Sequence, residues 1–199
     1  MTKIILTYIR ENIDNLVKIA IIYLVSIVIG MLIFNMTSFG KEFCNMVNDV
    51  FSKTKEANFE GINLLSNGIK NNLIYIVILL LSTFFIFCFP VISSCIIFKG
   101  ISVGMYMASC FKIFGFFKGM GFSFLDIIIP QLFCIFGYIL FANVLLQVHY
   151  IVKNHEKIAS SDILKYAIII VFSLCLISFS IVFEQLISPV CINIYTNIN

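Results

Sequence analysis

The chain has 199 residues, of which 61% are hydrophobic and 12% are charged, and its formal net charge is +3. An average soluble domain is about 45–50% apolar and about 25% charged, so this composition excludes an ordinary soluble domain and predicts an integral membrane protein in contact with lipid. The thirteen Lys and Arg residues are scattered along the sequence rather than clustered, which argues against nucleic acid as a partner.

Apolar runs of the length needed to cross a bilayer, about 20 residues, divide the sequence. They cover roughly residues 16–36, 73–98, 100–117, 127–148 and 166–187. We therefore predict one integral membrane domain over 1–199, folded as an all-α transmembrane helical bundle of about five spans, with an outer loop over 37–72. The first run is too long, and the NMTSFG after it is too poor a cleavage site, for a cleaved signal peptide, so we expect a retained anchor. Lys112 interrupts the third run, which leaves open whether that run crosses completely.

The orientation of the spans is predicted from positive charge, which favours the cytoplasmic side. With the N-terminus inside, the inner flanks hold seven Lys and Arg residues, Lys99 among them, and the outer flanks hold six. The outer loop also carries four acidic residues, and the C-terminal tail carries no positive charge. We predict an integral protein of the cell membrane with its N-terminus in the cytoplasm and its C-terminus outside.

The outer loop contains an amphipathic segment. Its apolar residues recur at helical spacing and are Phe43, Met46, Val47, Val50 and Phe51, with polar residues on the other face. This period predicts a helix. Its apolar stripe would lie on the bilayer surface, on the other spans, or on a partner protein that docks there.

Small residues form a ridge along the third apolar run. Gly100, Gly104 and Ala108 follow one another at intervals of four, and Gly115 and Gly119 repeat the spacing. Such a face lets a second helix approach closely in lipid. The ridge would pack against another span of the same chain or, in a homodimer, against a second copy.

Charged residues near the hydrocarbon are costly, which makes them candidates for a structural or functional role. Asp126 opens the fourth run and Glu184 lies near the end of the fifth. In the predicted topology both lie toward the outer face, as does Lys118. We hypothesise that Lys118 pairs with one of the two acids; the alternative is that all three reach to the interface.

Catalytic and metal-binding patterns are absent from the sequence. It has no HExxH, P-loop or GxSxG motif, and no Cys and His pair has metal-ligand spacing. We therefore expect no enzyme activity, no cofactor and no metal. An acid–base role for Asp126 and Glu184 is the minority alternative.

A set of short motifs occurs in order along almost the whole chain. They are Gly30 and Asn35, the pair Asn71 and Asn72, then Lys99, Gly100 and Gly104 as KGxxxG, the turn with Gly115, Lys118 and Gly119, then Pro130 and Gln131, and finally Glu184 followed by Ile187, Ser188 and Pro189. Together they resemble the stage II sporulation protein M family of polytopic membrane proteins. The chain departs from the family pattern at Leu132, where Asn is common, and at Ala108, where Gly is common, and Asp126 has no counterpart.

The resemblance implies a scaffold without a catalytic step, acting in the mother cell during engulfment of the forespore. Its implied partners are the stage II sporulation proteins D and P, which degrade peptidoglycan so that the septal wall thins. The rival hypothesis is the membrane permease component of a transporter, with Pro90 and Pro130 breaking helices around a midplane site. Two related halves would favour that rival, and the sequence has none.

Overall fold

The computed structural model describes residues 2–56, 61–82, 88–154 and 160–197, and these ranges contain helices and no strand. The elements are α1 (Thr2–Glu11), α2 (Ile13–Met36), α3 (Ser38–Glu56), α4 (Gly61–Ser82), α5 (Cys88–Phe114), α6 (Phe116–Ser123), the π-helix η1 (Phe124–Ile128), α7 (Ile129–Lys153) and α8 (Ser160–Asn197). The predicted all-α fold is confirmed.

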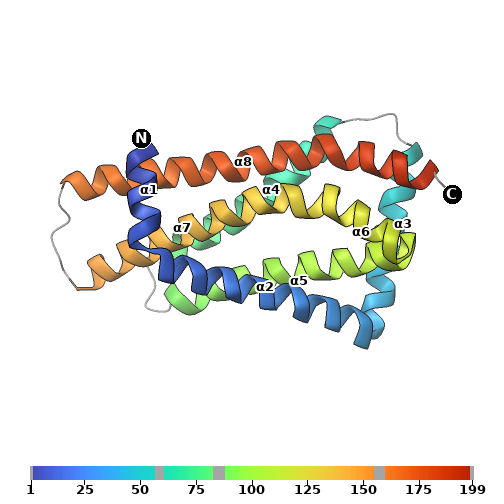
Figure 1. Cartoon of the computed structure of the whole chain (residues 1–199), viewed down its shortest axis with the longest axis horizontal. Coiled ribbons are helices and arrows are strands. Elements are labelled where there is room, and N and C mark those ends of the chain that lie inside the picture. Colours follow the sequence, from blue (N-terminus) through green and yellow to red (C-terminus); the bar gives the residue numbers. More distant parts are fainter. Residues whose placement is uncertain (1, 57–60, 83–87, 155–159, 198–199) are drawn as a thin grey trace.

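The helices form an elongated bundle. α2, α4, α5, α7 and α8 run along the long axis, while α1 and α3 lie across its opposite ends (Figure 1). The N-terminus lies at the end crossed by α1, and the C-terminus at the end where α3 lies (Figure 1). α2 packs along α5, and α7 packs along α8.

The number of spans differs from the predicted five. Four segments of the described chain are long and apolar enough to cross a membrane: 13–36, 89–114, 116–153 and 162–195. α4 runs alongside them (Figure 1), but the apolar part of it that the structure describes, Asn72–Ser82, is shorter than a span.

The predicted boundary between the second and third runs, at Lys99, is wrong. α5 continues from Cys88 to Phe114, so that Lys99 and the residues after it lie inside one helix. Pro90, which the sequence suggested as a break within a span, lies in the first turn of α5, where proline is tolerated. Lys99 and Lys112 both lie inside α5, so neither counts as a flanking charge, and the count behind the predicted orientation changes on both sides.

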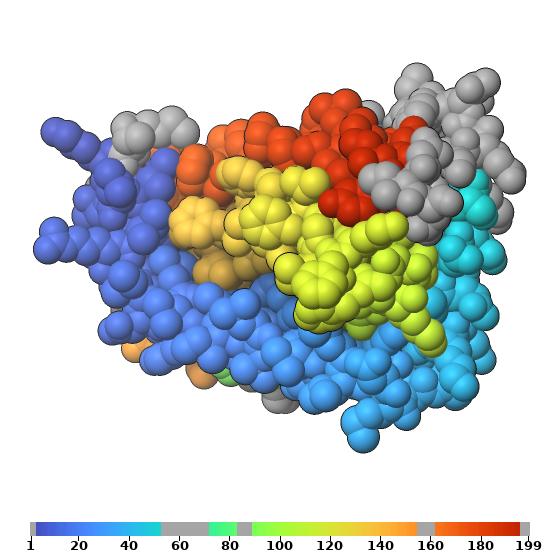
Figure 2. Space-filling model, turned by 45° about the vertical axis from the view of Figure 1, so that its right-hand side comes forward, coloured from blue at the N-terminus to red at the C-terminus, as the bar shows by residue number. Residues whose placement is uncertain are grey.

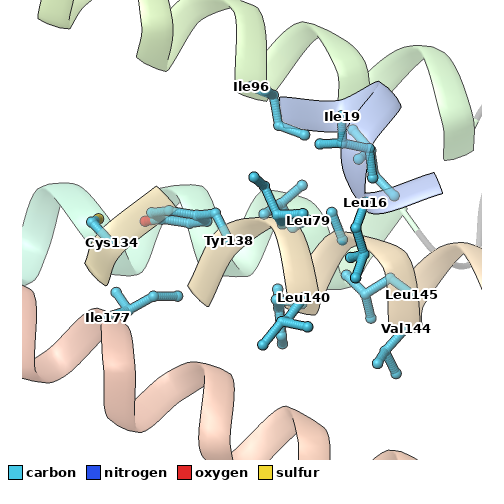
Figure 3. Packing of buried hydrophobic residues seen from close by; sticks show 14 of the residues in the cluster. Leu16, Ile19, Leu79, Ile96, Cys134, Tyr138, Leu140, Val144, Leu145 and Ile177 are labelled. Carbon is cyan, nitrogen blue, oxygen red and sulfur yellow. The ribbon is translucent and has the colours of Figure 1, made fainter. Parts of the chain in front are cut away.

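Apolar side chains lie both inside and outside the bundle, as expected for a helix bundle in lipid. The core between α2, α4, α5, α7 and α8 includes Leu16, Leu79, Ile96, Leu140 and Ile177 (Figure 3). The outer face of α2 is also apolar, and it forms a continuous surface along one side of the molecule (Figure 2). Its exposed residues include Val17, Ile21, Leu24, Val28 and Leu32.

Candidate functional site: a polar groove within the bundle

The predicted small-residue ridge packs against α2 of the same chain. A Cβ added at Gly104 would overlap the carbonyl oxygen of Ile27, and one at Gly100 would lie 2.6 Å from the Cβ of Ser26. Gly30 of α2 faces the backbone of Ile101 equally closely. These two helices therefore meet backbone to backbone, and a second copy of the chain would have to use another surface.

The remaining ridge residues have separate roles. Ala108 is buried in a cluster with Phe34 and Cys44, where the ends of α2 and α3 meet α5. Gly115 has a φ of +79° in the turn between α5 and α6, a conformation that favours glycine. Gly119 lies against the backbone of Cys110, so the turn folds α6 closely back onto α5.

The predicted amphipathic helix is α3, and it presents two apolar faces. Val47 and Phe51 are buried and Phe43 is half-buried. The Phe51 ring stacks on Phe114 at 5.5 Å between ring centres and meets Tyr106 edge-on at 6.3 Å. Part of the stripe therefore covers the end of the bundle.

The other part of that stripe faces outward. Met46 and Val50 are 60% and 55% exposed, and Phe39, about two turns before Met46, is 52% exposed. We call Phe39, Met46 and Val50 the outer face of α3.

Lys99 is held in the interior by three aromatic and amide side chains. Its Nζ donates a hydrogen bond of 2.9 Å to Asn72 Oδ1 of α4. It also lies 5.5 Å from the ring centre of Tyr75 and 5.4 Å from that of Tyr138. The Tyr138 hydroxyl donates to the same Asn72 oxygen at 3.0 Å. These contacts explain how α5 carries a lysine through its middle, since an amide oxygen and aromatic faces both stabilise a cation.

Lys99 forms one wall of a groove of about 520 Å³ between α4, α5, η1, α7 and α8, which we call the polar groove. Its lining residues are Ile74, Tyr75, Ile78, Lys99, Ser102, Val103, Tyr106, Asp126, Ile127, Gln131 and Glu184. The groove thus brings together four polar residues that the sequence analysis selected separately.

One acidic side chain of the groove, that of Glu184, lies near Lys99, which was not among the predicted partners. Glu184 lies within electrostatic range of Lys99 and of Asp126. Lys118 is exposed on α6 and is not among the groove residues. The sequence analysis did not consider Lys99 as a partner because it placed this residue in a connection.

Asp126 is fixed in the groove by its neighbours. It is only 3% exposed, and the Tyr106 hydroxyl donates to its Oδ2 at 3.1 Å. Ser188 of α8 also faces this carboxyl group. Asp126 lies on η1, and such π-helical turns occur frequently at functional sites.

The two selected prolines are accommodated in helices. Pro130 is the second residue of α7, where its missing N–H costs little. Its carbonyl oxygen accepts a 2.7 Å hydrogen bond from Ser180 of α8. Pro189 lies inside α8. Gly137 of α7, which the sequence analysis missed, lies against Ser173 and Ile177 of α8.

A second polar set, also missed, lies at the other end of the bundle. It comprises Tyr8, Glu11, Asn12, Asn143, Gln147 and Lys165, which we call the N-terminal cluster. Asn143 donates to the Tyr8 hydroxyl at 2.8 Å, Gln147 donates to Asn12, and Lys165 pairs with Glu11 at 2.6 Å. The amphipathic pattern of residues 2–11 could have indicated a helix that packs against the bundle at this end.

Burial in the N-terminal cluster affects one titratable group strongly. Desolvation raises the pKa of the Tyr8 hydroxyl well above its ordinary value, although the hydrogen bond from Asn143 opposes this shift. Tyr8 is therefore neutral throughout the physiological range. Lys165 also lies 5.7 Å above its ring.

Within the described residues, no group of three or more His, Cys, Asp or Glu side chains is arranged to hold a metal ion. Comparison of the chain with protein-family models, with curated protein sequences and with solved structures gives no match.

Proposed function

We propose that this protein is a non-catalytic membrane scaffold for sporulation. It recruits peptidoglycan-degrading partners, the stage II sporulation proteins D and P, to the septal membrane of the mother cell, where they thin the wall during engulfment. In this proposal the N-terminus is cytoplasmic and the α3 end of the bundle faces the wall.

The observation that carries the proposal is the convergence of the motifs on which the family resemblance depends. Asn72 and Lys99 are hydrogen-bonded to each other although 27 positions separate them. Gln131 and Glu184 line the same groove as Lys99. Motifs scattered over more than 100 residues thus contribute to one structural centre, which supports a common role for them.

The surface proposed for partner recruitment is the outer face of α3. α3 lies across the end of the bundle beside the C-terminus (Figure 1). Its inner face is held by ring contacts to α5 and α6, so the outer face is presented on a fixed support. Docking a partner there would bury side chains that are now more than half exposed.

The test has a cellular and a biochemical part. Deletion of the gene in a sporulating host is expected to arrest membrane migration around the forespore, as seen by imaging the septal membrane. Normal engulfment in the deletion strain would refute the scaffold.

The biochemical part separates recruitment from folding. Met46→Glu is expected to abolish recovery of the hydrolases with the tagged protein while the protein still accumulates in the membrane. Asn48→Glu introduces the same charge on the polar side of α3 and is expected to leave recovery unchanged. Equal recovery with both variants would exclude the outer face of α3 as the docking surface.

The permease component is the second candidate, and the polar groove favours it. Charged residues within a transmembrane bundle commonly mark a transport path. Substrate-dependent flux across vesicles that contain the purified protein would support this candidate, and it would not be expected from a scaffold.

A further inference from the structure

The polar groove contains hydrogen-bond acceptors that no described group satisfies. Asp126 Oδ1 and Gln131 Oε1 are both buried and without a hydrogen-bond partner. They come from η1 and the start of α7, and both residues line the groove. Buried acceptors are almost always paired in folded proteins, with protein groups, ordered water or a ligand, so these two acceptors mark a place in the groove where a hydrogen-bond donor binds.

The charge of the groove indicates that this donor is a cation. Asp126 and Glu184 provide two carboxyl groups, and Lys99 provides one ammonium group. That ammonium is already engaged by Asn72 and by the rings of Tyr75 and Tyr138. When both carboxyl groups are ionised, a ligand with one positive charge balances the groove.

The size and the chemistry of the groove favour an organic cation over a bare metal ion. Its volume of about 520 Å³ falls within the range of about 300–1,000 Å³ typical of small-molecule sites. In the part of the chain that the structure describes, no metal-ligating group of three side chains forms. A primary ammonium carries three N–H donors, which can reach separate acceptors.

We propose that the polar groove binds a primary ammonium group, with Asp126 Oδ1 and Gln131 Oε1 as its acceptors. The ammonium is supplied by the head group of an amine-bearing phospholipid or by a soluble amine. Ile74 and Ile78 of α4 and Val103 of α5 give the groove apolar walls beside its acceptors, which suit the hydrocarbon next to an amine. The Tyr106 hydroxyl donates to Oδ2 of Asp126 and Ser188 faces the same carboxyl group, but Oδ1 has no partner at hydrogen-bonding distance.

The experiment compares two head groups that differ in N–H donors but carry the same charge. The full-length protein is placed in phosphatidylglycerol nanodiscs that contain equal amounts of phosphatidylethanolamine and phosphatidylcholine. The ratio of the two lipids retained by the protein is measured by native mass spectrometry. A second arm records thermal unfolding by circular dichroism in detergent with ethanolamine or with choline chloride.

Wild-type protein is expected to retain phosphatidylethanolamine about tenfold more than phosphatidylcholine, the ratio expected from about one charge-assisted hydrogen bond. Asp126→Asn and Gln131→Met are expected to bring this ratio close to one. Asp49→Asn, which removes an exposed acid on α3, is the matched control and keeps the preference. If Asp126→Asn does not fold, the lipid ratio of Gln131→Met alone is compared with that of the wild-type protein.

The two arms distinguish the sources of the amine. Retention of phosphatidylethanolamine without an ethanolamine effect identifies the lipid, and a melting shift with ethanolamine but not choline identifies a soluble amine. The proposal is overturned if neither arm prefers the primary amine, or if the preference survives in the folded variants.

Discussion

The polar groove and the N-terminal cluster lie toward opposite ends of the same apolar bundle, and they treat their polar groups differently. In the N-terminal cluster the side chains pair with one another across α1, α7 and α8. In the polar groove, Lys99 is well held, but Asp126 Oδ1 and Gln131 Oε1 are not. The first arrangement is complete as it stands, and the second is complete only with a further donor.

This difference separates two reasons for placing polar residues in a membrane bundle. A polar pair between helices contributes about 1 kcal/mol or less on average. The N-terminal cluster therefore positions α1 and adds only modestly to the free energy of unfolding. An unpaired buried acceptor costs about 1–3 kcal/mol. The groove therefore carries a cost that a purely structural site would not need.

The largest expected effect on stability comes from the contact between α2 and α5, which supports both the polar groove and the N-terminal cluster. α5 carries Lys99 and packs along α2, which continues from α1. Gly104→Leu would drive a side chain into the carbonyl of Ile27, and we expect a loss of more than about 3 kcal/mol because backbone cannot shift as a side chain can. The measurement is membrane accumulation together with the unfolding midpoint in detergent.

The matched control for Gly104→Leu is Ser94→Leu, on an exposed position of the same helix. It is expected to leave accumulation unchanged, because the added side chain faces lipid. Normal accumulation of the Gly104 variant would show that α2 and α5 are not packed as closely as their backbones indicate.

The next largest effect on stability is expected at Asn72, which holds Lys99 beside the polar groove. Asn72→Leu removes the acceptor shared by Lys99 and Tyr138. We expect a loss of about 2–3 kcal/mol in the free energy of unfolding, since a hydrogen bond to a charged group is worth about 1.5–3 kcal/mol. Denaturant titration in detergent measures it.

The double variant Asn72→Leu with Lys99→Met tests the cause of that loss. If the loss arises because the Lys99 ammonium is left buried without its acceptor, the double variant is more stable than Asn72→Leu alone. Stability that falls further in the double variant would contradict this explanation.

A smaller effect is expected in the N-terminal cluster. Asn143→Leu removes the hydrogen bond to the Tyr8 hydroxyl, and we expect a loss of about 1 kcal/mol, typical of interhelical hydrogen bonds in membrane proteins. Tyr8→Phe should cost a similar amount, and the two changes together little more than one of them. Additive losses in this cycle would show that the pair is not coupled.

The sequence predicted what depends on local pattern and missed what depends on distant partners. The all-α fold follows from composition, and the spacing of Gly100 and Gly104 predicted a close helix contact. Lys99 was misplaced because a lysine in an apolar run normally marks an interface, and its acceptor Asn72 is 27 positions away. The unpaired acceptors of Asp126 and Gln131 are likewise a property of packing, which no spacing rule reveals.

The division of the α3 stripe was also beyond the sequence. Phe43, Met46, Val47, Val50 and Phe51 share one apolar face by their period, and that period does not say how wide a surface the bundle covers. Phe51 reaches Phe114, whereas Met46 stays exposed. The buried part of the stripe packs against residues of α5, α6 and α8.

The smallest effect is expected for the ion pair between Lys165 and Glu11, whose side chains are 29% and 53% exposed. Solvent screening limits such a pair to less than about 1 kcal/mol, so Glu11→Gln should lower the free energy of unfolding only slightly. Raising the salt concentration should weaken the wild-type protein by a similar amount and leave the variant unchanged. A larger loss, insensitive to salt, would mean that the pair is shielded from water. The N-terminal cluster would then depend on electrostatics as strongly as the polar groove does, and the contrast between the two regions would rest on their unpaired acceptors alone.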